Sequence, residues 1–364
     1  MPFRYRGEFA GDRFDTIVVG SGMGGLATAR LLAGAGQRVL VLERHYEPGG
    51  FLHTFKRKGW EWDVGVHYIG MVHQPRSGER RLFDVLTGGR LEWAAMGSPY
   101  DVAVIDGDRY DFVAGPKEQV ARWKAYFPEE AEAIDAYWER VRAVQAQSAR
   151  FFSERAMPPL IAGALRPWLT RGFQQWAQRT TWEVLRELTD NTRLIEVLCA
   201  QSGDYGLPPK ESSFAMHAIV VGHYRHGGAY PVGGARRIHE SLTAEIEARG
   251  GAVALHAPVA RIVLEGERAC GIELEDGERI HAKRVVSATG VHNTFFGLLP
   301  PDYRWPFALE DDLKRVSRSH GHLCLYVGLD ASDAALAMPK NNYWIFDTPG
   351  APGERIVDWY LSFP

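Results

Sequence analysis

The sequence is poor in cysteine. Cys199, Cys270 and Cys324 are the only three among 364 residues, they lie far apart, and none belongs to a C-x-x-C pair. This spacing excludes a disulfide framework and a cysteine-based zinc site, so no metal is expected. A reducing, cytoplasmic setting suits such a chain best.

Three further features are missing from the sequence. No run of about 18 apolar residues occurs, which a membrane-spanning helix would need. The N-terminal stretch carries scattered charges and lacks the apolar core of a secretory signal. The 42 basic and 45 acidic residues are mixed along the chain, and no basic tract is present. Nucleic acid is therefore not an expected partner.

The first pattern that is present begins close to the N-terminus. Residues 14–20 form a β-rich run that ends in glycine, residues 26–35 carry alanine and leucine at helical density, and residues 38–43 form a second β-rich run. This order predicts a βαβ unit of an α/β fold. Because 364 residues exceed the usual size of one domain, we expect a second domain as well.

A glycine string lies between the first strand and the helix. Gly20-Ser21-Gly22-Met23-Gly24-Gly25 has the G-x-G-x-x-G spacing of a dinucleotide-binding turn. Its glycines permit the tight turn, the approach of the main chain to a pyrophosphate, and close packing of helix on strand. Glu43 follows 23 residues after Gly20, where its carboxylate can bind the adenosine ribose. The alternative is a glycine-rich turn without a ligand, but strand, helix and acid in register favour binding.

A second glycine pair indicates which dinucleotide is bound. Gly49-Gly50 follows Glu43 after five residues and extends the binding loop toward the phosphates and the ribityl chain of a flavin. An NAD-binding domain has no need of this extension, so the combination predicts FAD. The alternative reading of Pro48-Gly49-Gly50 is an ordinary turn.

The rest of the chain predicts an interleaved arrangement. A Rossmann-like FAD-binding domain is assembled from residues 1–90 and 230–295, and an α+β substrate domain with a helical cap from residues 91–229 and 296–364. The expected elements are a hairpin at 102–112 around Asp106-Gly107, helical segments at 117–148 (broken at Pro128), 151–182 and 236–249, and short strands at 259–288.

Four segments, residues 18–55, 60–70, 203–234 and 285–300, resemble the phytoene desaturase, carotenoid isomerase and retinol saturase group of FAD-dependent oxidoreductases, and most closely retinol saturase. They include the motifs GVHYIG (65–70) and YPVGG (230–234). The resemblance implies that GVHYIG lies beside the isoalloxazine and that YPVGG lines the substrate passage. The cofactor-binding residues that it implies are Gly20, Ser21, Gly22, Met23, Gly24, Gly25, Glu43, Arg44, Gly49, Gly50, Val259 at the adenine, and Ala288.

Two departures from related families stand out. Amine oxidases tend to have an arginine after the glycine pair, and this chain has Phe51, which weakens an amine oxidase interpretation. Chains of the resembled group are also longer and carry another flavin-contacting segment and a closing helix. We therefore expect the sequence to be truncated at its C-terminal end.

The resemblance makes His67 and Tyr68 the catalytic candidates nearest the flavin, where either could transfer a proton or merely pack. His217, His223 and His226 lack the spacing of a zinc site, so we expect a helical face instead. Residues 156–176 combine apolar side chains with arginine and tryptophan, which suits a helix lying on a membrane surface, although core packing explains the same pattern.

These patterns leave three hypotheses. The first is an FAD-dependent oxidoreductase that saturates, desaturates or isomerises a double bond of a hydrophobic polyene, a retinoid or carotenoid, with an external electron donor or acceptor. The second is a non-catalytic lipid or polyene carrier that retains the fold. The third is an FAD oxidase of another small hydrophobic molecule. We expect a cytoplasmic protein, either free or peripheral on the membrane.

Overall fold

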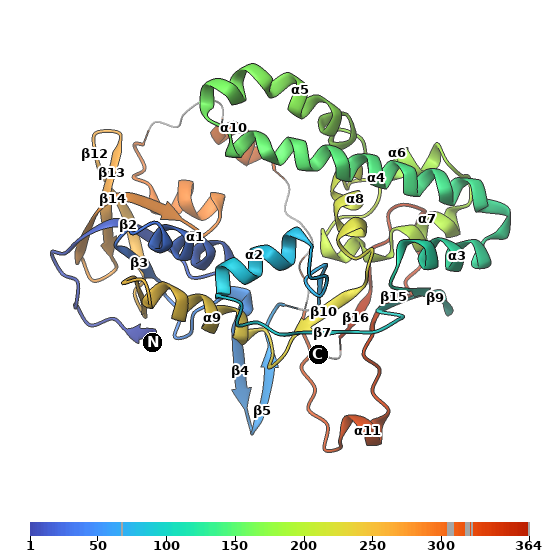
Figure 1. The fold of residues 1–364 in the computed structure, drawn as a ribbon, viewed down its shortest axis with the longest axis horizontal. Coiled ribbons are helices and arrows are strands. Elements are labelled where there is room, and N and C mark those ends of the chain that lie inside the picture. The colour runs from blue at the N-terminus through green and yellow to red at the C-terminus, as the bar shows by residue number, and fades with distance from the viewer. Residues whose placement is uncertain (67, 304–308, 317–320, 322, 363–364) are drawn as a thin grey trace. The chain divides into compact units, whose positions relative to one another are not determined.

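The computed structural model describes residues 1–66, 68–303, 309–316, 321 and 323–362 (Figure 1). The chain forms two units of mixed α/β structure, which are described separately. The first comprises Met1–His67, Pro75–Ala94 and Pro231–Arg318, and the second Tyr68–Gln74, Ala95–Tyr230 and Ser319–Pro364. The cofactor and substrate roles given to two such parts of the chain stay predictions.

The first unit is built on a sheet with the strand order β1-β11-β3-β2-β14-β13-β12. Strands β1 to β14 in this order run parallel, and β14, β13 and β12 form an antiparallel meander. All four residues of β3 are buried, as expected for a central parallel strand. The strands are β1 (Phe3–Arg4), β2 (Arg13–Val19), β3 (Val39–Leu42), β11 (Ala252–Leu255), β12 (Val259–Glu265), β13 (Arg268–Leu274) and β14 (Arg279–Ser287).

Helices cover this sheet. α1 packs on β2 and β3, α9 packs on β11, and the two helices contact each other. Buried Glu245 of α9 pairs with Arg30 of α1 at 3.3 Å, which links the two helices, and with Arg249 just after α9 at 2.6 Å. The remaining elements of the unit are α1 (Met23–Gly34), η1 (Gly50–Leu52), β4 (Thr54–Arg57), β5 (Trp60–Asp63), α2 (Gly78–Thr87), α9 (Arg236–Glu247), η5 (Asn293–Leu298) and α10 (Leu309–Arg315).

The second unit contains a sheet with the order β16-β15-β8-β9, in which β15 and β8 run parallel. The predicted hairpin is confirmed, since Asp106 and Gly107 join β8 and β9 with positive φ values of 52° and 88°. The strands of this sheet are β8 (Asp101–Ile105), β9 (Asp108–Phe112), β15 (Asn342–Phe346) and β16 (Trp359–Leu361). A separate short strand, β6 (Ile69–Gly70), pairs with β10 (Gly228–Pro231). The chain passes from one unit to the other within β7 (Trp93–Ala95) and within β10.

The helices of the second unit surround one apolar core. The predicted break at Pro128 is confirmed, because α3 ends at Tyr126 and α4 begins at Ala131. The helices are α3 (Pro116–Tyr126), η2 (Pro128–Glu130), α4 (Ala131–Ser153), η3 (Glu154–Ala156), α5 (Pro159–Ala177), α6 (Thr181–Arg186), α7 (Thr192–Leu198), η4 (Ala200–Asp204), α8 (Phe214–His223) and α11 (Asp333–Leu336).

Candidate functional site

The glycine string follows β2 at the carboxyl edge of the parallel strands. Gly20 has a φ of 95°, and a Cβ there would lie 3.3 Å from the carbonyl oxygen of Ala288. A Cβ on Gly25 would lie only 2.1 Å from the carbonyl oxygen of Gly20. Both positions therefore require glycine, because a side chain would separate α1 from the turn.

The other two glycines of the string face open space. Apart from their chain neighbours and the backbone of α1, none of the described residues has an atom within 4 Å of the place where a Cβ on Gly22 or Gly24 would stand. α1 begins at Met23 with Gly22 as its N-cap, without a side-chain cap and without an acidic residue in the first turn. A helix start of this kind presents its N–H groups and positive dipole end to an anion, so the turn fits a pyrophosphate.

Glu43 joins this turn to the end of β3. The Ser21 N–H and hydroxyl donate to Oε2 of Glu43 at 2.9 and 2.6 Å, and the His45 N–H donates to Oε1 at 2.8 Å. A carboxylate accepts about four hydrogen bonds, so one position on Oε1 remains for a ribose hydroxyl. The hydrogen bonds between Ser21 and Glu43 were not predicted, because the sequence pattern does not indicate a partner for a single serine in a glycine turn.

The second glycine pair lies against the first. The Gly49 N–H donates to the carbonyl oxygen and to the Oγ of Ser21, both at 3.1 Å, and Gly49 bridges to Gly22. Gly49 has a φ of 114°, and a Cβ on Gly50 would lie 3.1 Å from the Gly22 Cα. The two motifs therefore pack directly against each other and form one loop region, as a flavin-binding extension requires.

The ring of His239, on α9, packs against this loop at Gly49. The sequence patterns did not predict this contact. The side chain is 4% exposed, and a Cβ on Gly49 would come within 2.9 Å of its ring. Burial lowers the pKa of His239 to about 4, so the imidazole is neutral at pH 7. Its Nε2 lies 3.9 Å from Oε1 of Glu47, and neither ring nitrogen has a hydrogen-bond partner in the described part of the chain.

Three further residues are implied for the cofactor, Arg44, Val259 and Ala288, and each lies at one end of a strand of this sheet. The Ala288 N–H donates to the carbonyl oxygen of Val19 at 2.8 Å. The Ala257 N–H donates to the main-chain oxygen of Glu43 at 2.9 Å, and Val259 opens β12 two residues later. Arg44 is exposed beside them. Arg44 and Ala288 follow the carboxyl ends of β3 and β14, where open α/β sheets bind their ligands, and Val259 stands at the amino end of β12.

Of the two catalytic candidates, His67 lies outside the described residues. Tyr68 belongs to the second unit, where its side chain is 2% exposed. Its hydroxyl donates to Oδ2 of Asp101 at 2.5 Å, and burial raises the pKa of Tyr68 well above its usual value. The proton-transfer roles of His67 and Tyr68 stay predictions.

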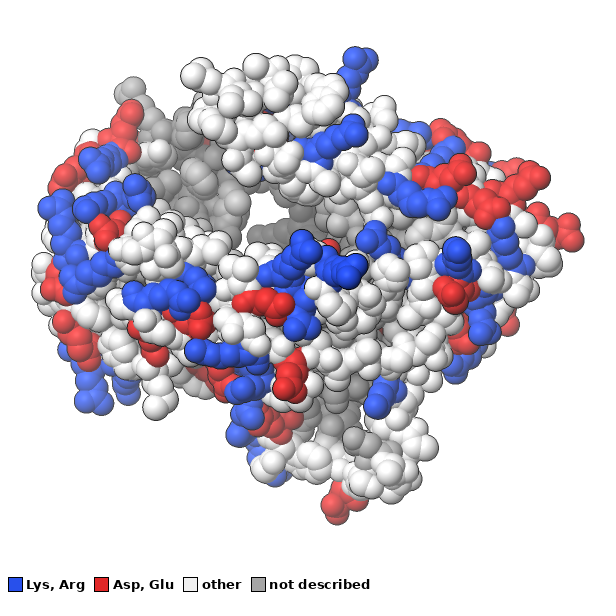
Figure 2. Space-filling model, viewed as in Figure 1, with Lys and Arg blue, Asp and Glu red and all other residues white. Residues whose placement is uncertain are grey.

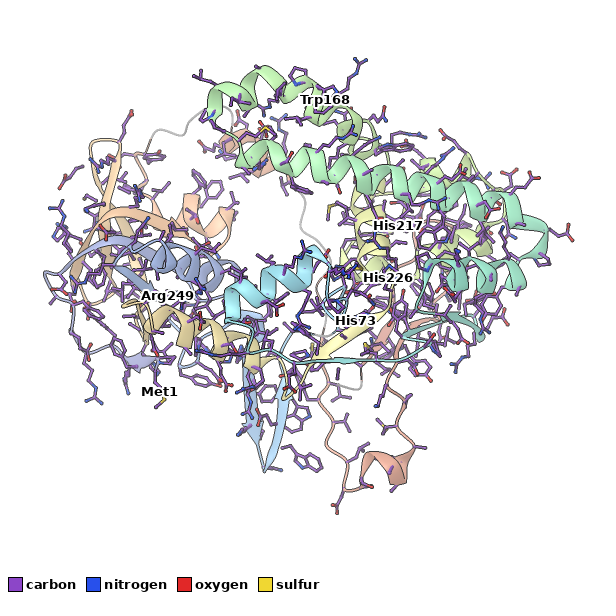
Figure 3. The ribbon with its side chains drawn as sticks, in the orientation of Figure 1. Met1, His73, Trp168, His217, His226 and Arg249 are labelled. Atoms are coloured by element: carbon purple, nitrogen blue, oxygen red, sulfur yellow. The ribbon has the colours of Figure 1, made fainter. Side chains whose placement is uncertain are left out.

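The three histidines considered for a metal site have different hydrogen-bond partners or positions, and Figure 3 labels two of them, His217 and His226. His217 is buried on α8, where its ring nitrogens bond the hydroxyls of Tyr137 and Tyr205 at 2.8 and 3.1 Å. His223 accepts the Gly70 N–H at 2.8 Å, and His226 lies in the loop after α8. The expected helical placement is therefore observed for His217 and His223.

The YPVGG motif leads into α9 in the first unit. Gly233 and Gly234 have φ values of 91° and 87°, and the Ala235 N–H donates to both carboxylate oxygens of Asp63 at 3.2 Å. A carboxylate at a helix start is stabilised by the dipole. Asp63 thereby holds the beginning of α9.

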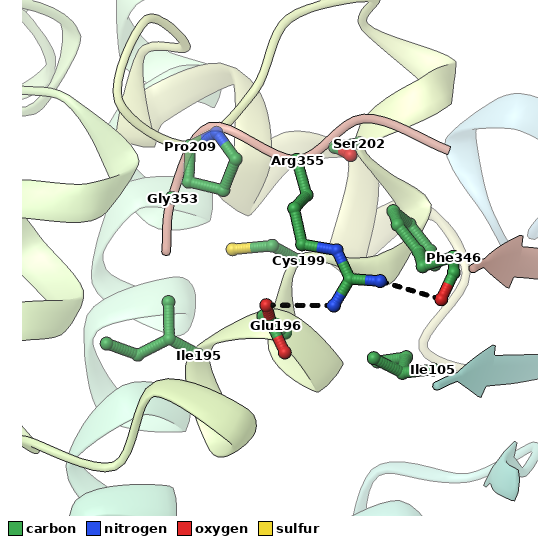
Figure 4. Close-up of a pocket in the computed structure, with 9 residues that line it drawn as sticks. All are labelled: Ile105, Ile195, Glu196, Cys199, Ser202, Pro209, Phe346, Gly353 and Arg355. Atoms are coloured by element: carbon green, nitrogen blue, oxygen red, sulfur yellow. Dashed lines mark hydrogen bonds and ion pairs between the residues drawn. The ribbon is translucent and has the colours of Figure 1, made fainter. Parts of the chain in front are cut away.

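A cavity in the second unit lies between α7, β15 and the segment around Gly353 (Figure 4). Arg355 crosses it and bonds Glu196 at 3.3 Å and the Phe346 carbonyl oxygen at 2.7 Å. The cavity has a volume of 20 Å³, which is enough for about one water molecule. It is far too small for a polyene.

α5 carries the stretch predicted to lie on a membrane. Leu160 is 91% and Trp168 67% exposed, with Ile161 and Leu165 exposed on the same helix. Figure 2 shows mainly uncharged side chains over α5, and its sequence contains arginine but no acidic residue. Over the described residues, none of the helices combines the length and the hydropathy needed to cross a bilayer.

The chain is similar to known proteins over most of its length. The family described as "Flavin containing amine oxidoreductase" matches residues 23–301. An all-trans-retinol 13,14-reductase of Danio rerio is 38% identical and aligns over 91% of this chain and 56% of its own length. An "Inactive all-trans-retinol 13,14-reductase" of the same fish is 31% identical (97% of this chain, 62% of that protein). A chloroplastic prolycopene isomerase of Arabidopsis thaliana is 25% identical (87% and 54%). The chain thus spans less than two thirds of these relatives.

Solved structures share the fold. An oxidoreductase from Methanosarcina mazei has a TM-score of 0.53 at 20% identity, over 78% of this chain and 60% of that one. Cyclohexylamine oxidase from Brevibacterium oxydans has a TM-score of 0.54 at 21% identity, over 80% and 61%. The expected α/β class with a Rossmann-like FAD-binding fold is confirmed, and the family description confirms the expected flavin cofactor, FAD.

Proposed function

The chain belongs to the flavin containing amine oxidoreductase family, and we propose that it is an FAD-dependent oxidoreductase that saturates, desaturates or isomerises a double bond of a hydrophobic polyene, a retinoid or carotenoid. The observation that carries this proposal is the 38% identity, over 91% of the chain, to a protein named all-trans-retinol 13,14-reductase. The prolycopene isomerase relative supports a polyene as the substrate class.

The cofactor site proposed is the loop at the carboxyl edge of the first unit's sheet. The start of α1 after Gly22 would hold the pyrophosphate, the carboxylate of Glu43 the ribose, and Gly49-Gly50 the adjoining phosphate. Val259 would meet the adenine through its main chain, and Ala288 would line the same edge. Support comes from the open space at Gly22 and Gly24 and from the acceptor position left on Glu43.

When bound, FAD supplies hydride transfer at its N5 atom. The chain would provide the position of the polyene, the exclusion of water and the accompanying proton. His67 and Tyr68 are proposed for the segment beside the flavin, and YPVGG for the substrate passage. An external donor or acceptor of electrons completes the cycle, since a second nucleotide fingerprint is not found in the sequence.

The test is the visible spectrum of the purified protein reconstituted with FAD. Flavin absorbance that bleaches with dithionite and recovers when a retinoid or carotenoid is added, with a reduced product found by chromatography, supports the oxidoreductase. The proposal is contradicted if the protein binds flavin, but no polyene reoxidises the reduced flavin and the protein neither desaturates nor isomerises a polyene.

A carrier without catalysis is the second candidate, and the 31% identity to a protein named inactive favours keeping it. The same preparation separates the two. A protein that binds retinoid, measured by quenching of tryptophan fluorescence, but leaves it chemically unchanged with and without reduced flavin would be the carrier.

We also propose that α5 contacts a membrane surface, from which a polyene could enter. Exposed Leu160 and Trp168, together with arginines and no acid on the helix, support an interfacial position. Flotation with phosphatidylcholine vesicles, with and without phosphatidylserine, tests this. Trp168→Ala should weaken vesicle binding, whereas Leu82→Ser, at an exposed leucine of α2, should not; equal binding of both variants would contradict it.

A further inference from the structure

A buried carboxyl group stands at the start of β8. Asp101 is 0% exposed and accepts three hydrogen bonds from uncharged donors. The Tyr68 hydroxyl and Nε2 of Gln201 donate to Oδ2 at 2.5 and 2.7 Å, and Nδ2 of Asn342 donates to Oδ1 at 3.1 Å. The donors come from a segment before β6, from η4 and from β15, so this one side chain joins four parts of the unit.

No lysine or arginine forms an ion pair with Asp101 in the part of the chain that the structure describes. A buried carboxylate without a cation is costly, and desolvation raises the pKa of Asp101 to about 7 although its three hydrogen bonds lower it. The titratable groups that face it are the carboxyl of Asp204 and the hydroxyls of Tyr68, Tyr100, Tyr224 and Tyr360.

The Tyr68 ring is tightly packed. A Cβ on Gly228 would come within 2.4 Å of its ring, and the ring centroid of Tyr224 lies 4.5 Å away. Because the ring is held, the direction of the phenolic proton depends on Asp101. An ionised carboxylate accepts that proton, whereas a protonated carboxyl can donate to the phenolic oxygen and leave the phenol to donate elsewhere.

We infer that Asp101 is a positioning residue that acts through Tyr68, and that its ionisation switches the hydrogen bond which fixes Tyr68 next to β6. This inference rests on the proposed function, in which residues 65–70 lie beside the flavin. It adds Asp101 to the set of residues that govern the reaction, although Asp101 itself touches neither substrate nor cofactor. A merely structural Asp101 would hold Tyr68 equally at every pH.

The test uses the FAD-reconstituted chain and three variants. Asp101→Asn keeps the size of the side chain but removes the titration, and Tyr68→Phe removes the hydroxyl. Asp106→Asn is the matched control, because Asp106 lies on the same hairpin but is exposed and pairs with Arg193 and Arg355. Infrared difference spectra between about pH 5 and pH 9 report the protonated carboxyl, and the pH profile of polyene turnover reports its effect.

We expect a carboxyl band that titrates near neutral pH in the wild type and in Asp106→Asn, shifts in Tyr68→Phe, and is lost in Asp101→Asn. In Asp101→Asn, kcat should fall by about tenfold with KM little changed, because one charge-assisted hydrogen bond is lost. The step in the pH profile of turnover should disappear in this variant. An Asp101→Asn enzyme that keeps the wild-type band and pH step overturns the inference. If the wild type turns over no polyene, the proposed function fails, while the infrared titration still decides the role of Asp101.

Discussion

The buried carboxyl of Asp101 makes a prediction about stability as well. Its pKa rises from 3.8 to about 7 in the folded chain, so the native state binds a proton that the unfolded state releases across this range. The group therefore stabilises the fold fully below about pH 4, and this contribution is lost as the pH rises through 7. A shift of about three pKa units corresponds to about 4 kcal/mol, because each unit is worth about 1.4 kcal/mol.

Asp101→Asn cannot titrate, so this pH dependence should be absent from the variant. We expect the free energy of unfolding of the wild type, relative to Asp101→Asn, to fall by about 4 kcal/mol between about pH 4 and pH 8. Urea unfolding followed by tryptophan fluorescence at several pH values measures the difference.

Asp106→Asn serves as the control because its titration has the opposite sign. Hydrogen bonds from Arg355 and Arg193 lower the pKa of the exposed Asp106, so its small contribution to stability is present at neutral pH and lost in acid. Parallel curves for the wild type and Asp101→Asn from about pH 4 to pH 8 would refute the assignment of a raised pKa to Asp101.

Three further changes test the first unit. Glu43→Ala should weaken FAD binding about 10- to 100-fold, since Ser21 also loses its buried acceptor at a cost of about 1–3 kcal/mol; a flavin fluorescence titration with unchanged affinity would contradict the ribose assignment. Gly49→Ala should purify with little flavin, read from the ratio of visible to ultraviolet absorbance, because its φ is 114° and the new Cβ would stand 2.9 Å from His239. Adding His239→Ala should restore only part of the flavin, because the strained φ remains; full restoration would assign the whole effect to the clash. Leu26→Ala, at a fully buried position of α1, should lower the free energy of unfolding by about 2–5 kcal/mol in urea; a smaller loss would mean that α1 is loosely packed.

Local patterns predicted several elements correctly. The hairpin at Asp106-Gly107 is confirmed because two successive positive φ values suit that dipeptide, and the helix from Arg236 is confirmed because its apolar residues repeat at helical spacing. The glycine string likewise lies between a strand and a helix, where its spacing placed it. In each case the determining interactions lie within a few residues of one another.

The candidate site was only partly predictable. Gly20 to Gly25, Glu43 and Gly49-Gly50 carry a signal because their spacing is fixed along the chain. His239 carries none: it stands among ordinary polar residues of a helix, and only the packing of α9 against the loop brings it beneath Gly49. The chemistry of the substrate likewise came from resemblance and from relatives, since no residue type in the sequence is specific to a polyene.

The sequence by itself determined the cofactor class, because the turn, the helix start and the acid proposed for the ribose follow one another within about thirty residues and depend on local backbone geometry. Only the tertiary structure decided how distant groups share a proton or a hydrogen bond. Asp101 meets Tyr68, Gln201 and Asn342 across separations of 33, 100 and 241 residues, and its burial, which sets its pKa, depends on all of them at once. In the sequence alone, Asp101 cannot be distinguished from any other aspartate at the start of a strand.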